Sequence, residues 1–167
     1  MIDESYKWYV VYTRNQHEKK VFKDSIKMNI VAFLPMEKRV RYWSDRKKII
    51  DSPLFPNYVF LKLSNREYFS ILGHPSVVQF VKQGNELSTI SDEQIQSVQT
   101  IIDKQMEYNI KRYCPEKGSV VQIMSGPLKG FFGEVVRTNN ETHAIIRIRE
   151  IWQSIYVKID RDALVIV

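Results

Sequence analysis

The pattern of apolar and polar positions along the chain changes near Gly118. Before it, apolar and aromatic runs with a two-residue period are interspersed with stretches whose apolar side chains recur every three or four residues. The first pattern predicts strands and the second predicts amphipathic helices. The expected strands are residues 7–13, 30–40, 57–63 and 77–82, and the expected helices are residues 15–28, 65–72 and 91–108.

After Gly118, five short β-rich runs punctuated by glycines predict a small barrel, because an open sheet of that size would leave its edges exposed. Helices between strands predict a mixed, mainly antiparallel sheet with helices for residues 1–108. The polar stretch 109–117, which contains Pro115, is expected to be a linker. The predicted fold class is therefore α+β, with an N-terminal α/β sandwich and a C-terminal five-stranded β-barrel at residues 118–167.

The first predicted helix has an apolar side and a basic side. Asn15 lies three residues before Glu18, which is the spacing of a capping box. Phe22 and Ile26 are expected to point into the core, and lysines occupy another face. These lysines are Lys19, Lys23 and Lys27, with Lys20 beside them. Residues 41–50 are expected to form a projecting basic hairpin around a polar turn.

Positive charge is concentrated in one part of the chain. The net charge is +6, and residues 14–48 alone hold 11 Lys/Arg against 4 Asp/Glu. Residues 113–167 hold 7 against 6 and are nearly neutral. A local basic patch suits a polyanion, most often nucleic acid, but a solvated charged face that binds nothing would have the same composition.

No motif of catalysis or metal binding is found. His17, His74 and His143 fall in three different predicted elements, and the single cysteine, Cys114, excludes an internal disulfide. Phosphate-binding loops, nucleophile elbows and dinucleotide-binding glycine motifs are absent from the sequence. We therefore expect no enzymatic activity, no cofactor and no metal. With neither a signal peptide nor an apolar run long enough to span a membrane, the expected location is the cytoplasm.

Two motifs together resemble a known family. Residues 117–133 (KGSVVQIMSGPLKGFFG) look like a KOW motif, in which glycines form the tight turns of a small SH3-like barrel. Residues 8–12 (WYVVY) and 53–60 (PLFPNYVF) resemble the N-terminal domain of NusG, called NGN. The LFPNY version is most similar to the specialised RfaH-like and UpxY-like paralogues. The resemblance covers residues 6–167, whereas a KOW motif alone also occurs in ribosomal proteins.

The resemblance implies a contact with RNA polymerase. In the family, an apolar depression on the N-terminal domain binds the coiled coil of the polymerase clamp. Tyr58 and Phe60 share one face of their strand, and they would belong to this surface unless they pack inside like ordinary strand residues. The matching positions are Tyr12, Tyr58, Phe60 and Val81, with Phe55 and Phe80 nearby.

The resemblance also implies a contact with upstream or non-template DNA through the first helix. Phosphate neutralisation would give affinity without sequence readout, and a solvated helix face is the alternative. His17, Arg14 and Gln16 are the candidates for base contacts. The matching positions are Arg14, His17, Lys19, Lys20 and Lys23.

Family members use the KOW barrel to bind a second factor, either a small-subunit ribosomal protein or the termination factor Rho. Phe131, Phe132, Ile151 and Trp152 match the partner-binding loops, and we expect one residue of each adjacent pair to point inward.

The function that the resemblance implies is transcription elongation or antitermination by a monomeric protein. It would suppress pausing or termination, on specific operons such as polysaccharide loci. The alternatives are a ribosomal or RNA-binding KOW protein and a housekeeping NusG.

Overall fold

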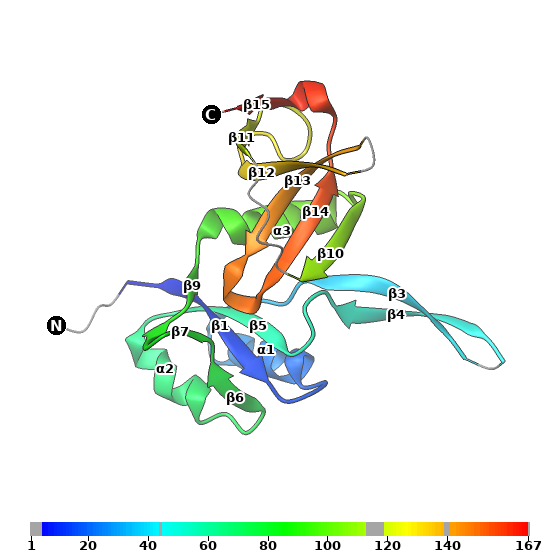
Figure 1. Ribbon diagram of the computed structural model, residues 1–167. Coiled ribbons are helices and arrows are strands. Elements are labelled where there is room, and N and C mark those ends of the chain that lie inside the picture. The colour runs from blue at the N-terminus through cyan, green and yellow to red at the C-terminus, as the bar shows by residue number, and fades with distance from the viewer. Residues whose placement is uncertain (1–4, 44, 113–118, 139–140, 167) are drawn as a thin grey trace. The chain divides into compact units, whose positions relative to one another are not determined.

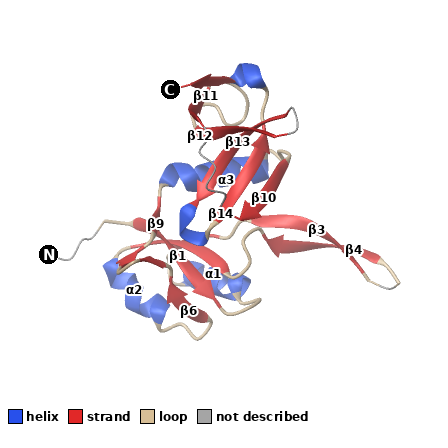
Figure 2. Cartoon of the chain, in the orientation of Figure 1, coloured by secondary structure: helices blue, strands red, loops and turns tan. Residues whose placement is uncertain are grey.

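The structure is a computed structural model that describes residues 5–43, 45–112, 119–138 and 141–166. The chain divides into two compact units, Met1–Ser91 and Asp92–Val167, and each is described by itself. Figure 1 labels the elements along the chain, and Figure 2 separates helices from strands.

The first unit is built on an antiparallel sheet with the strand order β2-β5-β1-β6, and β9 also pairs with β1. The strands of this sheet are β1 (Lys7–Thr13), β2 (Val31–Phe33), β5 (Tyr58–Leu63), β6 (Val77–Phe80) and β9 (Thr89–Ile90). Its helices are α1 (Glu18–Lys27) and α2 (Asn65–Leu72). Two hairpins complete the unit: β3 (Met36–Tyr42) with β4 (Lys47–Pro53), and β7 (Lys82–Gln83) with β8 (Glu86–Leu87). The predicted basic hairpin at residues 41–50 is confirmed in position and is longer than expected.

The core of the first unit lies on one face of this sheet. Alternate residues of β1 and β5, among them Val11 and Leu61, are fully buried there together with Val21 of α1 and Ile71 of α2. The side-chain period of two in a strand sends the remaining positions to the opposite face. Burial of aliphatic side chains between sheet and helices is the main driving force that holds α1 and α2 in place.

Helix α1 begins later than expected and uses different contacts. The residue before it is His17, and no side chain caps its first turn, so the predicted capping box of Asn15 with Glu18 is wrong. Glu18 is instead buried and accepts a hydrogen bond from the Asn57 backbone N–H at 2.7 Å. Ile26, expected in the core, is 50% exposed because the buried stripe of the helix runs through Glu18, Val21 and Ser25.

The second unit contains α3 (Asp92–Asp103) and a sheet of the order β10-β14-β13-β12-β11-β15. The strands are β10 (Tyr108–Arg112), β11 (Ser119–Ile123), β12 (Phe132–Thr138), β13 (Glu141–Ile148), β14 (Gln153–Lys158) and β15 (Leu164–Ile166). Two 3-10 turns, η1 (Arg149–Ile151) and η2 (Arg161–Ala163), join the later strands. The predicted α+β class is confirmed, and within the described residues this sheet has six strands where five were expected.

The additional strand comes from the expected linker. Residues 109–112 belong to β10, whose five residues pair antiparallel with β14, so this part of the linker prediction is wrong. Alternating tyrosine and isoleucine in a polar segment was a signal for an edge strand that the charged neighbours obscured. Residues 113–117 lie outside the described residues, and the domain boundaries at 108 and 118 stay predictions.

Candidate functional site

Five aromatic residues gather on the face of the first sheet that is opposite to α1 and α2. The register places Tyr12 against Tyr58 and both Val10 and Phe33 against Phe60, so these side chains share that face. Ring centroids lie 5.4 Å apart for Tyr12 and Tyr58, 5.9 Å for Phe33 and Phe60, and 6.0 Å for Phe55 and Phe60. We call Tyr12, Phe33, Phe55, Tyr58 and Phe60 the aromatic face.

Only part of the aromatic face is accessible. Tyr12, Phe33 and Tyr58 are half-buried, whereas Phe55 and Phe60 are 2% and 1% exposed. Tyr58 and Phe60 were expected to share an accessible surface. Tyr58 is partly accessible, but Phe60 is not, because the rings of Phe33 and Phe55 pack against it. Partial burial, reinforced by the neighbouring Tyr12, raises the pKa of the Tyr58 hydroxyl, which keeps it neutral and able to donate a hydrogen bond.

Phe80 is separated from the other predicted polymerase-binding residues. It lies in the core on the helix side of the sheet, in edge contact with Tyr9 and stacked on Tyr68 of α2. Phe80 is 2% exposed, as is Phe55, so the structure places neither of these two rings at the surface. Val81 is half-buried and donates its N–H to the carbonyl of Val10 at 2.8 Å.

The predicted nucleic-acid-binding residues do share one region, at the β1–α1 loop and the first turns of α1. The Arg14 backbone N–H donates to the Ser76 carbonyl at 3.0 Å, which fixes the start of the loop. His17 is half-buried, and its Nδ1 lies 2.9 Å from the Ser76 hydroxyl, so that nitrogen is already engaged. The remaining four candidates are exposed: Arg14, Lys19, Lys20 and Lys23.

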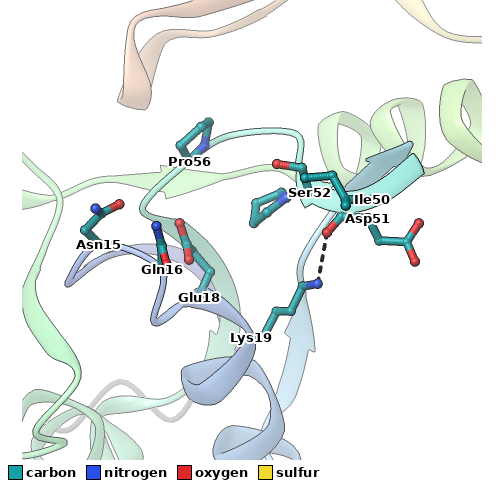
Figure 3. Close-up of a pocket in the computed structure, with 9 residues that line it drawn as sticks. Asn15, Gln16, Glu18, Lys19, Ile50, Asp51, Ser52 and Pro56 are labelled. Carbon is teal, nitrogen blue, oxygen red and sulfur yellow. Dashed lines mark hydrogen bonds between the residues drawn. The ribbon is translucent and has the colours of Figure 1, made fainter. Parts of the chain in front are cut away.

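A half-open pocket of about 400 Å³ adjoins these residues (Figure 3). Polar side chains from the β1–α1 loop, including Asn15 and Gln16, face the last residues of β4 across it. Lys19 crosses between the two sides and donates from Nζ to the Asp51 carbonyl at 2.9 Å. Sequence reasoning missed Asn15, Asp51 and Ser52 at this place, because only the tertiary structure brings β4 beside α1.

In the second unit, one of the two predicted partner-binding pairs, Ile151 with Trp152, divides as expected. Phe132 is 62% exposed at the start of β12 and Phe131 is half-buried. Ile151 is buried in η1, whereas Trp152 is 68% exposed with a positive φ of 55°. A left-handed backbone is uncommon for so bulky a residue, and the indole of Trp152 lies at the surface.

Metal-ligand clusters and membrane-spanning helices are both absent from the described residues. Among them, no three or more His, Cys, Asp or Glu residues are grouped to hold a metal ion. None of the helices found in the same residues combines the length and apolarity needed to cross a membrane.

Comparison with known proteins assigns the family. Residues 6–99 match the family described as "Transcription termination factor nusG", and residues 117–149 match the KOW motif. The NusG transcription termination/antitermination protein of Chlamydia pneumoniae is 27% identical over 141 residues, covering 78% of this chain and 77% of its own length. The protein of the same description from Thermus thermophilus is 26% identical over 158 residues, covering 82% and 85%.

The fold has a counterpart among solved structures. The structure described as "Domain interaction in Thermotoga maritima NusG" superposes with a TM-score of 0.53 and 21% sequence identity, covering 98% of both chains. At that identity the likeness supports the fold, and the family rests on the sequence match over more than half of the chain. An N-terminal match to nusG, followed by a KOW motif in a small β-sheet unit, shows that this chain belongs to the NusG family of transcription factors.

Proposed function

We propose that the protein acts in transcription elongation and antitermination by binding RNA polymerase through the aromatic face of its first unit. The observation that carries the proposal is the half-buried Tyr12–Tyr58 pair on the sheet face that no helix of this unit covers, within the segment that matches nusG. Aromatic side chains that keep part of their surface accessible are typical anchors of protein interfaces. On the same face, Phe33 and Phe55 pack against Phe60.

A helix from the polymerase is a suitable occupant for such a face. Amphipathic helices bind apolar surfaces through side chains spaced three and four residues apart, and the Tyr hydroxyls add polar contacts at the rim. The clamp coiled coil is the partner that the family resemblance implies. The action would be to bind and hold, with no chemical step.

The exposed cations of α1 and its preceding loop support a second contact, with upstream or non-template DNA. Arg14, Lys20 and Lys23 are solvent-exposed and carry no ion pair among the described residues. Phosphates neutralised by these side chains would give affinity that falls with salt and that does not depend on base sequence. The adjoining pocket with Asn15 and Gln16 offers donors and acceptors for base contacts.

The KOW barrel is proposed to recruit a second factor, with Phe132 and Trp152 as anchors. Both aromatic side chains are more than 60% exposed, and accessible aromatic side chains are typical anchors of protein interfaces. A small-subunit ribosomal protein or Rho is the partner class that the resemblance implies. A specialised role on particular operons, such as polysaccharide loci, rests on the LFPNY sequence of residues 54–58.

The alternative of a ribosomal or RNA-binding KOW protein requires the strongest positive field on the barrel. Residues 113–167 carry 7 Lys/Arg and 6 Asp/Glu, whereas residues 14–48 of the first unit carry 11 and 4. This distribution favours nucleic-acid contact by the first unit.

The test is the affinity of the full chain for purified core RNA polymerase, measured by biolayer interferometry. The variant Tyr12→Ala/Tyr58→Ala is compared with wild type and with Phe69→Ala, which removes an aromatic ring that is 74% exposed on α2. Loss of an interface anchor costs about 2 kcal/mol or more, so Kd should rise about 30-fold or more for the double variant and stay within about twofold for Phe69→Ala.

Phe60→Ala is unsuitable for this test, because emptying so buried a site costs about 3–5 kcal/mol of folding free energy. Circular dichroism of each variant verifies that the sheet is intact. Equal affinity of the double variant and wild type, or no binding by either, would remove the polymerase-binding proposal.

A further inference from the structure

The β3–β4 hairpin is a two-stranded ribbon with two chemically different faces. Within the described residues, β3 and β4 pair only with each other, and Figure 1 shows them extending away from the sheet of their own unit. The register pairs Val40 with Ile49 and Tyr42 with Lys47, so these four side chains share one face. The opposite face carries the basic positions Arg39 and Lys48, which are adjacent in sequence to Val40 and Lys47. Of these two, Arg39 is ion-paired with Glu37.

The first of these faces exposes apolar and aromatic side chains to an unusual degree. Tyr42 is 73% exposed, Trp43 57%, Ile49 66% and Val40 51%. Trp43 follows Tyr42 at the tip of the hairpin. The Trp43 backbone N–H donates a hydrogen bond of 2.9 Å to the Arg46 carbonyl. We call Tyr42 and Trp43 the aromatic tip. These rings contribute nothing to the core, so folding gives no reason for two adjacent aromatic residues at this position.

Positive charge surrounds the aromatic tip. Residues 38–48 hold 6 Lys/Arg and 1 Asp/Glu, a net charge of +5 in eleven residues. The ammonium group of Lys47 lies over the Tyr42 ring, 5.1 Å from its centroid. At the base of the ribbon, Lys19 of α1 donates to the Asp51 carbonyl, and the Leu54 N–H donates to the Pro35 carbonyl at 2.8 Å. The ribbon is therefore tied at its base to the rest of the first unit.

We propose that the β3–β4 hairpin is a single-stranded nucleic-acid-binding element, in which the aromatic tip stacks on an unpaired base and the flanking cations bind its phosphates. Proteins that bind single strands without sequence preference combine aromatic side chains for stacking with a positive surface that follows the backbone. The hairpin has both features within eleven residues. This site is separate from the exposed cations of α1, and it does not depend on polymerase binding.

Charge complementarity favours a polyanion over an apolar protein surface as the occupant. A protein partner for the apolar face would leave the net charge of +5 to be neutralised by acidic residues at the rim, whereas every nucleotide brings one base and one phosphate together. Duplex DNA would satisfy the cations but would offer no base for stacking, because its bases are already stacked on each other. An unpaired segment is therefore the ligand that uses both features.

The experiment measures binding of the full chain to short oligonucleotides that carry the fluorescent base 2-aminopurine. Single-stranded DNA, single-stranded RNA and a fully paired duplex of the same sequence are compared by anisotropy and by emission intensity. Stacking on an aromatic ring quenches 2-aminopurine, so wild type should quench the single strands and not the duplex. The ratio of the two single-strand affinities shows whether the hairpin prefers DNA or RNA.

The variants separate stacking from charge. Tyr42→Ala/Trp43→Ala should weaken single-strand binding about tenfold or more and abolish quenching, while the slope of log Kd against log salt stays unchanged. Trp43→Phe should retain quenching. Lys48→Ala should reduce that slope by about 0.7, the value for one phosphate contact on a single strand. Phe69→Ala, which removes an exposed ring of the same unit, is the matched control and should behave as wild type.

Two outcomes would overturn the proposal. The first is unchanged quenching and affinity in Tyr42→Ala/Trp43→Ala, which would leave the α1 cations as the site of any oligonucleotide binding. The second is a loss of polymerase affinity in this variant with normal oligonucleotide binding, which would make the hairpin a protein-docking element. Neither outcome affects the test of Tyr12 and Tyr58, so failure here is distinguishable from failure of the proposed function.

Discussion

Glu18 shows how a single buried carboxylate joins segments that are distant in sequence. It is 5% exposed, and its Oε1 accepts the backbone N–H of Asn57, 39 residues further along the chain. Asn57 has a φ of 70° and lies in the turn that leads into β5 and the aromatic face. The carboxylate therefore holds this turn against the start of α1.

We predict that Glu18→Ala lowers the free energy of unfolding by about 2 kcal/mol, because the Asn57 N–H would lose a charge-assisted hydrogen bond in a partly buried site. Urea denaturation followed by circular dichroism measures the change. Asn57→Gly keeps the N–H and relieves the positive φ, so it should leave stability unchanged or slightly raised. Lys20→Ala, on the exposed side of the same helix, is the surface control, and a similar loss for it would contradict the assignment.

At the scale of elements, α2 is stabilised by a complete capping box. Ser64 precedes the helix, its hydroxyl oxygen accepts the Arg66 N–H at 3.3 Å, and its own N–H donates to Glu67 Oε2 at 2.9 Å. The Ser64 hydroxyl also donates to the Glu67 carboxylate, and this hydrogen bond is the main cause that holds the Glu67 pKa below its usual value. The helix covers residues 65–72 as predicted, and its cap satisfies N–H groups that a short helix would otherwise leave free.

We predict that Ser64→Ala lowers the free energy of unfolding by about 1 kcal/mol at neutral pH. Because the pKa of Glu67 is lowered in the folded state, its contribution is fully present above about pH 4.5 and is lost as the pH falls through the folded-state pKa. The difference between wild type and Ser64→Ala should therefore shrink below about pH 4. Denaturant titrations at pH 7 and pH 3 measure it, with Ser70→Ala on the same helix as control. A difference independent of pH would show that Glu67 takes no part.

Much of the element pattern could be predicted from the sequence, since local periodicity governs it. Strand β1 and helix α2 have the expected bounds, because alternation and a stop at Gly73 are properties of neighbouring residues. Strand β10 was missed, because its pairing with β14 joins residues more than forty positions apart. The inward orientation of Ile26 was also wrong, since the packing of α1 on the sheet selects which side of the helix is buried.

At the scale of the whole molecule, the second unit begins with α3 and not with the KOW motif. The Gln94 side-chain amide in α3 donates to the Arg147 carbonyl in β13 at 2.9 Å, and β10 covers the edge of β14. In β13, Arg147 also donates twice to Glu134 of β12, each at 2.9 Å, in a bidentate ion pair. Helix α3 and strand β10, which precede the KOW motif in the sequence, therefore belong to the second unit.

We predict that a segment of residues 92–167 unfolds cooperatively and at a Tm at least about 5 °C above that of residues 118–167. The shorter segment loses β10, which leaves the edge of β14 without hydrogen-bond partners, and it loses the contact of Gln94 with Arg147. Thermal unfolding followed by circular dichroism compares the two segments. Equal Tm values would favour the predicted domain start at residue 118.

The sequence by itself determined the basic hairpin, the Tyr58 and Phe60 alternation and the turns of the KOW motif, because these depend on local period, composition and glycine conformation. Only the tertiary structure decided which aromatic residues are accessible. Phe60 is covered because Phe33 and Phe55 arrive from other segments, and Phe80 is buried because its strand presents it to α2. Burial depends on neighbours that are distant in sequence, and local pattern does not specify them.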